Sequence, residues 1–166
     1  MNNTEKENQA SNFILKETSF SGKTAIILGS GLGEYAQILS EQKILAFSNI
    51  PHYPISNVEG HAGELVSGKI FGKEILIAKG RVHCYEGYSV EEVTFPIRVF
   101  KQCGIRNLII TNSSGSLQKK NKPGTLMLIK GHLDCSFQNN YHELKLVTGD
   151  KYHSKELIKL SEKVAL

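Results

Sequence analysis

The chain has 166 residues, of which 40% are hydrophobic and 22% are charged, and its formal net charge is +4. This composition is typical of one globular domain with a buried core, and so mild a charge argues against a nucleic-acid partner. The three cysteines are too widely spaced for a disulfide framework, no apolar run could span a membrane, and no signal-peptide core is found, so we expect a cytoplasmic protein without membrane contact.

The first part of the chain predicts a strand that leads into a glycine-rich loop. Residues 1–17 are mostly polar and are expected to form a flexible leader, whereas residues 18–166 are expected to form one incomplete α/β domain. Residues 24–28 (TAIIL) are a short apolar run that ends at a glycine, which is typical of a buried strand. The loop 29–33 (GSGLG) follows, and residues 34–40 are predicted to be helical.

The middle of the chain predicts a long loop, a hairpin and a helix. Residues 49–63 (NIPHYPISNVEGHAG) show no apolar period, and long loops of this kind are often functional. Residues 64–70 and 74–78 are apolar arms around FGK and predict a β-hairpin. A capping box, S-x-x-E, starts at Ser89 and predicts a helix that ends near Gly104. Its predicted apolar face consists of Val90, Val93, Ile97 and Phe100.

The last part of the chain predicts two more strands and a final helix. Residues 107–111 (NLIIT) and 125–130 (TLMLIK) are the strand candidates, and residues 153–166 form an amphipathic helical pattern with no cap at its end. We interpret this uncapped end as a sign of truncation. Strands that alternate with helices and a hairpin predict an α/β fold, with a mixed β-sheet flanked by helices.

The glycine-rich loop has two interpretations. GSGLG lacks the G-x-G-x-x-G spacing of a dinucleotide fold, and no acidic residue stands roughly 20 positions further on to bind a ribose. It also lacks the lysine of a Walker A loop. The loop amides and the Ser30 hydroxyl could hold an anion, but a tight turn between a strand and a helix explains the glycines equally well.

Other residues suited to an oxyanion follow later in the chain. Arg81 and His83 stand two residues apart after the hairpin and would match a phosphate, although a surface arginine beside a structural histidine is the alternative. His61 stands between small residues, and Ser113 lies in a turn at the end of a strand; a solvated histidine and a bare turn are the alternatives. Tyr85 could contact a sugar or pack in the core. The remaining histidines lack metal-ligand spacing, so no metal site is expected.

Five motifs occur in an order that resembles a known family: GSGLG, GHAGELV, KGRVHCYEGY, VTFPIRVF and TNSSGSL. Together they resemble the N-terminal part of the purine nucleoside phosphorylases of the trimeric, low-molecular-mass class, over about residues 20–130. The resemblance implies a transferase of purine salvage that converts purine (deoxy)ribonucleosides and phosphate to the free base and (deoxy)ribose 1-phosphate. It implies purine nucleoside and phosphate as partners, a homotrimer, and no cofactor, since inorganic phosphate is a co-substrate.

The resemblance also implies roles for individual residues. Tyr85 would contact the ribose, and His83 and Glu86 would be catalytic, with Glu86 orienting His83. Phosphate would be bound by Ser30, His61, Arg81, Val82, His83 and Ser113. The family's G-P-x-F-E-T motif, whose glutamate holds the purine, does not occur in the sequence. We therefore expect a fragment with the phosphate and ribose half of the site, inactive or nearly so by itself.

Three alternatives stay open at this point. A methylthioadenosine- or xanthosine-type phosphorylase would share the same motifs, because the choice of base depends on residues that the sequence does not contain. A non-catalytic remnant that binds phosphate or associates with a complete subunit is the alternative from another class. An unrelated α/β domain would require five ordered motifs to coincide by chance.

Overall fold

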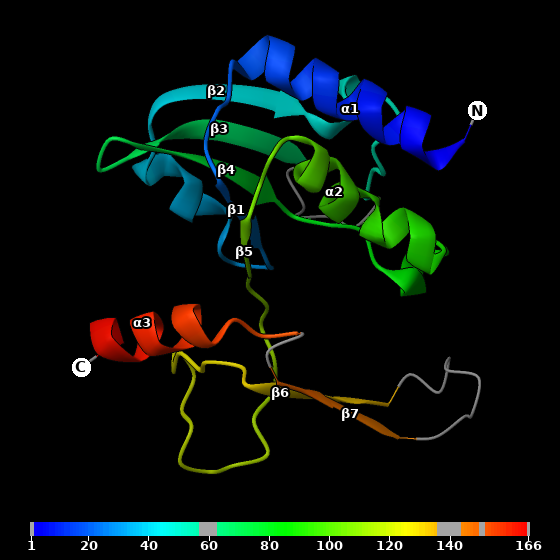
Figure 1. Ribbon diagram of the computed structural model, residues 1–166. Helices are drawn as coiled ribbons and strands as arrows, with labels where there is room; N and C mark the ends of the chain where they lie inside the picture. The colour runs from blue at the N-terminus through cyan, green and yellow to red at the C-terminus, as the bar shows by residue number, and fades with distance from the viewer. Residues whose placement is uncertain (1, 57–62, 136–143, 150–151, 166) are drawn as a thin grey trace. The chain divides into compact units, whose positions relative to one another are not determined.

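The computed structural model describes residues 2–56, 63–135, 144–149 and 152–165 (Figure 1). Its contacts divide the chain into two units, Met1–Gly115 and Ser116–Leu166, where the sequence predicts one domain over residues 18–166. Among the described residues, the first unit contains a five-stranded sheet and two α-helices, and the second contains a two-stranded sheet and one α-helix. Each unit is described by itself below.

The sheet of the first unit is mixed. Its strand order is β2-β3-β4-β1-β5, and the strands are β1 (Thr24–Leu28), β2 (Ser40–Ala46), β3 (Glu64–Ile70), β4 (Lys73–Lys79) and β5 (Asn107–Ile110). β1 runs parallel to both β4 and β5, whereas β2, β3 and β4 form antiparallel pairs. The predicted first strand and the hairpin are confirmed, and so is the fold class, a mixed sheet flanked by helices.

The N-terminal segment forms a helix, so the prediction of a flexible leader over residues 1–17 was wrong. Helix α1 (Asn3–Thr18) begins at Asn2 with a capping box. Ala10 and Ile14, one helical turn apart, are completely buried in the core of the first unit. The polar composition of the segment hid this short apolar stripe, which packs into that core.

Helix α2 (Val90–Gln102) begins at Ser89 with the predicted capping box and continues through Pro96. Gly104 follows its end with a φ of +84°, a conformation that favours glycine. The predicted apolar face is partly wrong, because Val90 is 59% exposed. The buried residues of the helix are Phe95, Pro96, Val99 and Phe100.

Alternate residues of β1 enter two different cores. Ala25 and Ile27 belong to the core that α1 and α2 cover, whereas Ile26 and Leu28 belong to a smaller core on the other face. The smaller core is covered by a 3₁₀ helix, η1 (Gly33–Ile38), which stands where the sequence predicts a helix over residues 34–40. Two further 3₁₀ turns are η2 (Phe47–Asn49) and η3 (Cys84–Glu86).

The second unit pairs β6 (Gly131–Asp134) with β7 (Lys145–Thr148) in antiparallel fashion, and α3 (Lys155–Ala165) follows. The predicted strand over residues 125–130 is not formed. Leu126 in this segment is 95% exposed, and residues 125–130 pair with no strand in the part of the chain that the structure describes. Within the described ranges, no helix is long and apolar enough to cross a membrane.

Candidate active site

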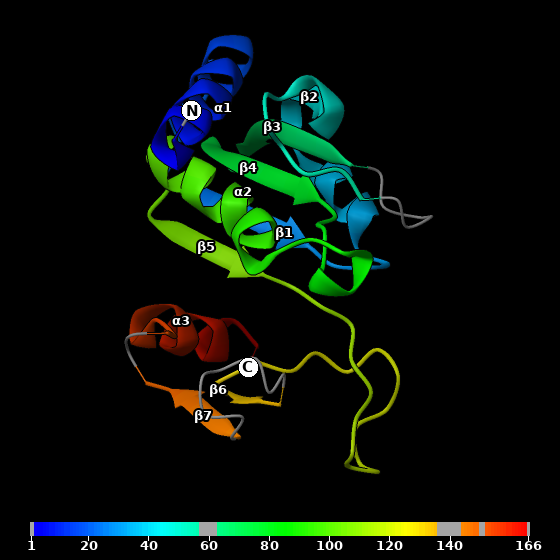
Figure 2. The same cartoon turned by 90° about the vertical axis from the view of Figure 1, so that its right-hand side faces the viewer.

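The loops that follow β1, β4 and β5 all leave the sheet of the first unit at the carboxyl ends of these strands. Leu28 of β1 pairs with Lys79 of β4, and Ile27 pairs with Ile110 of β5, so the carboxyl ends of the three parallel strands are level. Figure 2 shows their arrowheads pointing in one direction. Loops at the carboxyl ends of parallel strands are the usual ligand-binding region of α/β sheets.

The loop after β1 is held against the loop after β5. The Gly29 N–H donates to Thr111 Oγ1 over 2.9 Å, and Ser113 Oγ donates to the Ser30 carbonyl over 3.0 Å. A Cβ at Gly29 would lie 2.7 Å from the Thr111 carbonyl oxygen, so only glycine allows this approach. Gly31, with a φ of +81°, turns the loop back, and Ser30 at its tip is exposed.

The Arg81 side chain connects the loops after β4 and β5. Its Nη1 donates to the Thr111 carbonyl over 2.8 Å, and its Nε donates to His83 Nε2 over 3.3 Å. Val82 between them is buried. The Arg81 side chain is half-buried. These two hydrogen bonds fix its guanidinium at the carboxyl end of the sheet, among the three loops.

Glu86 fixes His83 from the other side. Its Oε1 accepts from the His83 backbone N–H over 2.8 Å and lies 3.1 Å from His83 Nδ1, while its Oε2 accepts from Ser56 Oγ over 2.7 Å. These hydrogen bonds, first that from Ser56, hold the pKa of Glu86 below its ordinary value. Because Arg81 can only donate, Nε2 of His83 accepts this hydrogen bond, and its Nδ1 faces Glu86.

Of the other predicted site residues, Tyr85 is described by the structure and His61 is not. Tyr85 is 75% exposed, and its ring stacks on His83 with centroids 4.8 Å apart. His61 lies outside the described residues. In the described part of the chain, no group of three or more histidine, cysteine, aspartate or glutamate side chains could hold a metal ion.

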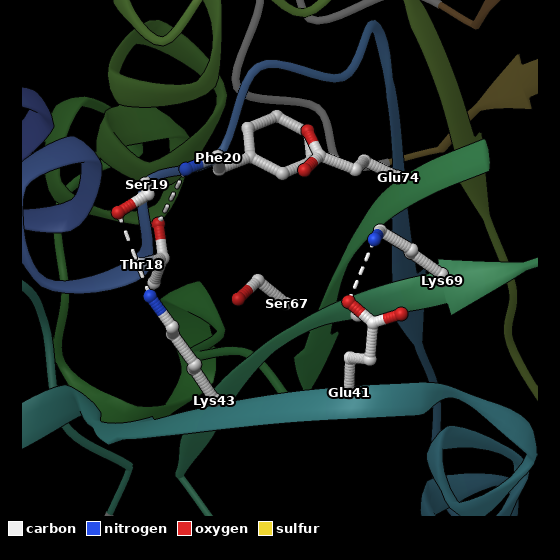
Figure 3. A pocket seen from close by; sticks show the side chains of 9 residues that line it. Thr18, Ser19, Phe20, Glu41, Lys43, Ser67, Lys69 and Glu74 are labelled. Atoms are coloured by element: carbon white, nitrogen blue, oxygen red, sulfur yellow. Dashed lines mark hydrogen bonds and ion pairs between the residues drawn. The ribbon is translucent and has the colours of Figure 1, made fainter. Parts of the chain in front are cut away.

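Described residues of the first unit line an apolar cavity and a polar pocket. An apolar cavity of about 280 Å³ adjoins Arg81 and lies between α2 and the sheet. A polar pocket of about 160 Å³ lies near the C-terminal end of α1 (Figure 3). There Lys69 forms an ion pair with Glu41 over 2.6 Å, and the Glu74 carboxylate accepts two hydrogen bonds from Ser21. None of the predicted site residues lines this second pocket.

Sequence reasoning missed two residues that hold the site together. Thr111 contacts both Gly29 and Arg81, and its place at the end of a predicted strand was the available signal. Ser56 lies in an irregular loop thirty residues from Glu86, and no local pattern connects the two. The assembled groups are a guanidinium, a histidine and several hydroxyls, which suit the binding of an oxyanion.

Comparisons with known proteins identify the family to which the chain belongs. Residues 23–165 match the phosphorylase superfamily. The chain is 43% identical over 134 residues to purine nucleoside phosphorylase 1 of Geobacillus stearothermophilus, and 44% identical over 126 residues to that of Bacillus subtilis. These alignments cover 81% and 76% of this chain but 48% and 46% of the relatives. The chain thus spans about half the length of the curated relatives it matches.

A solved structure is similar as well. Isoform 2 of the purine nucleoside phosphorylase of Schistosoma mansoni, in complex with cytosine and ribose-1-phosphate, superimposes with a TM-score of 0.66 and 41% sequence identity. The superposition covers 72% of this chain and 42% of the other. Sequence and structure comparisons therefore agree on the family and on the extent of the match.

Proposed function

Since the chain belongs to the phosphorylase superfamily, we propose that its three carboxyl-end loops form the phosphate- and ribose-binding half of a purine nucleoside phosphorylase site. The reaction would be the phosphorolysis of a purine (deoxy)ribonucleoside to the free base and (deoxy)ribose 1-phosphate. The observation that carries the proposal is the Arg81 guanidinium, held between the Thr111 carbonyl and His83 at the edge where the loops meet. A fixed cation in such a place favours an anionic substrate.

Arg81 would position the phosphate and stabilise its charge. In phosphorolysis a phosphate oxygen attacks the anomeric carbon, the glycosidic bond breaks, and its electron pair leaves with the base. The sugar is cation-like at that moment, so a phosphate held rigidly beside it acts both as nucleophile and as a stabilising charge. The side chain of Arg81 and the loop around Ser30 would provide this rigidity through preorganised donors.

Glu86 would act through His83. Its carboxylate fixes both the backbone and the ring of His83, so that Nε2 faces Arg81. We assign Glu86 the role of a positioning residue and His83 that of a contact to phosphate. Tyr85, stacked on His83 and largely exposed, would contact the ribose. His61, Val82 and Ser113 complete the proposed phosphate site.

The wider proposals follow from the family. The partners would be a purine nucleoside and inorganic phosphate, with no cofactor, and the complete enzyme would be a cytoplasmic homotrimer. Residues 18–166 would belong to one domain of that enzyme, which the superfamily match over residues 23–165 supports. The relative from Schistosoma mansoni was solved with ribose-1-phosphate, which supports a sugar phosphate as a ligand here.

A calorimetric titration of the 166-residue chain with inorganic phosphate, and then with ribose 1-phosphate, tests the proposal. We expect Arg81→Ala to weaken phosphate binding by roughly 10- to 100-fold, the effect of losing charge-assisted hydrogen bonds. Arg106→Ala is the matched control, because Arg106 is exposed and directly precedes the amino end of β5, away from the loops. No phosphate binding by the unaltered chain, or equal losses in the two variants, would refute the proposal.

A further inference from the structure

A series of hydrogen bonds and close polar contacts runs through the side chains of the candidate site. Ser56 Oγ donates to Glu86 Oε2 over 2.7 Å, and Glu86 Oε1 lies 3.1 Å from His83 Nδ1. His83 Nε2 accepts from Arg81 Nε over 3.3 Å, and Arg81 Nη1 donates to the Thr111 carbonyl over 2.8 Å. The series therefore connects the loop before β3 with the loops after β4 and β5, and it begins at Ser56.

The segment that carries Ser56 is anchored in the first unit. Phe47 and Tyr53 are buried in its core, and their ring centroids lie 4.7 Å apart. Closer to Ser56, the Tyr88 hydroxyl donates to the Ile55 carbonyl over 2.5 Å. Because core packing and this hydrogen bond fix the backbone just before Ser56, the Ser56 hydroxyl meets the loop after β4 from a defined position.

The two oxygens of the Glu86 carboxylate have different partners. Oε1 accepts from the His83 backbone N–H and lies against the His83 ring, whereas Oε2 accepts from Ser56. Only 6% of the Glu86 side chain is exposed, so water is poorly placed to replace a lost donor. Without the Ser56 hydroxyl, the carboxylate is less restrained against rotation away from His83, and its charge is less stabilised.

We infer that Ser56 is a positioning residue of the proposed phosphate site: its hydroxyl fixes the Glu86 carboxylate, which in turn fixes His83 beside Arg81. The inference rests on the proposed function. It adds to that function a residue from the loop before β3 that touches neither phosphate nor sugar and acts through Glu86.

The same contact affects the pH range over which the site keeps its geometry. The hydrogen bond from Ser56 is the largest of the causes that hold the pKa of Glu86 below its ordinary value, so Ser56 helps to keep Glu86 ionised as the pH falls. In the part of the chain that the structure describes, the titratable side chain in contact with Glu86 is His83, and Arg81 is the charged group next to it.

Calorimetric titration of the 166-residue chain and its variants with inorganic phosphate tests the inference. At pH 7 we expect Ser56→Ala to weaken phosphate binding roughly 3- to 10-fold, the net effect of one lost hydrogen bond. Ser56→Thr keeps the hydroxyl and should retain most of the affinity. On acidification, the affinity of Ser56→Ala should begin to fall at a higher pH than that of the unaltered chain, because the pKa of Glu86 is no longer held as low. Phosphate itself titrates equally in both experiments, so the ratio of the two affinities reports on the protein.

Ser21→Ala is the matched control. Ser21 Oγ also donates to a glutamate, Glu74 Oε2, over 2.7 Å. This pair lies at the amino ends of β1 and β4, where Glu74 lines the polar pocket (Figure 3), and the candidate site lies at the carboxyl ends of these strands. The control should therefore leave both the phosphate affinity and its pH dependence unchanged.

Thermal melts establish that each variant is folded, and Ser56→Cys, whose thiol is a weak donor, replaces Ser56→Ala if the latter is not. The inference is overturned if Ser56→Ala binds phosphate as tightly as the unaltered chain at pH 7, or if the ratio of their affinities stays constant on acidification. It is also overturned if Ser56→Thr or Ser21→Ala loses as much affinity as Ser56→Ala. These outcomes leave the phosphate binding of the unaltered chain and its loss in Arg81→Ala intact, whereas no binding by the unaltered chain refutes the proposed function and the inference together. The two failures are thus distinguishable.

Discussion

Two regions of the first unit are stabilised by different interactions. One is the face of the sheet that the helices cover, and the other consists of the loops at the carboxyl ends of the strands. On the covered face, Ala10 and Ile14 of α1 and Phe100 of α2 are almost completely buried against the sheet. At the carboxyl ends, Arg81 and Glu86 are held by hydrogen bonds to neighbouring loops. The first region depends on the removal of apolar surface from water, and the second on the direction of polar contacts.

This difference teaches that stability and binding are separable in the first unit. A loss of buried volume should destabilise the fold while leaving the loops of the folded molecules unchanged. A change to the polar contacts of the carboxyl-end loops should alter binding while costing little stability.

Phe100→Ala should lower the free energy of unfolding by about 3–5 kcal/mol, because it removes a buried aromatic ring and leaves a cavity. Urea denaturation measures the change. Phe71→Ala, at a hairpin position that is 100% exposed, is the control and should change stability by less than about 0.5 kcal/mol. The comparison breaks down if phosphate affinity, measured under conditions where the variant is folded, falls together with stability.

Glu7→Gln should cost about 1–2 kcal/mol, because it removes a charge-assisted bond between α1 and α2. Glu7 Oε1 accepts from Arg98 Nε over 2.6 Å, and Arg98 keeps its bonds to Thr94 and to the Glu91 carbonyl in the variant. Glu17→Gln, at an exposed position of the same helix, is the control. Equal costs for the two changes in thermal unfolding would show that the pair does not hold α1 in place.

Glu86→Gln should have the smallest effect on stability and a pH-dependent one. The pKa of Glu86 is held below 4.5, chiefly by the Ser56 hydroxyl, so its ionised form favours the folded state. This contribution is present above the pKa of the unfolded chain and is lost as the pH falls through the lowered folded pKa.

The stability difference between the unaltered chain and Glu86→Gln should therefore be largest near neutral pH and shrink below about pH 4. Urea denaturation at several pH values measures it, with Glu34→Gln at an exposed position as the control. Phosphate affinity should fall at the same time, because His83 loses its fixed orientation. A constant difference over the whole pH range would mean that the carboxylate charge has no part in it.

Much of the fold was predictable because its signals are local. The apolar run of β1 and the capping box at Ser89 depend on neighbouring residues alone, and both are confirmed. The sequence does not predict helix α1 despite its capping box at Asn2, because its many polar residues obscure the helical spacing of Ala10 and Ile14. The run over residues 125–130 was misjudged because its apolarity says nothing about whether a partner strand exists.

The candidate site shows the same limit. The spacing of Arg81, His83 and Glu86 is local, and the structure brings the three into contact. Their roles in binding and catalysis stay predictions. Thr111 and Ser56 reach the site from distant parts of the chain, and no sequence period records such long-range contacts.

The ion pair between Glu7 and Arg98 also has a consequence for the time course of synthesis. The two residues are 91 positions apart, so a ribosome that adds about 5–20 residues per second needs roughly 5–20 s to proceed from one to the other. During that interval Ala10 and Ile14 have no α2 to pack against. Helix α1 therefore reaches its full burial only after the strands and α2 have been synthesised.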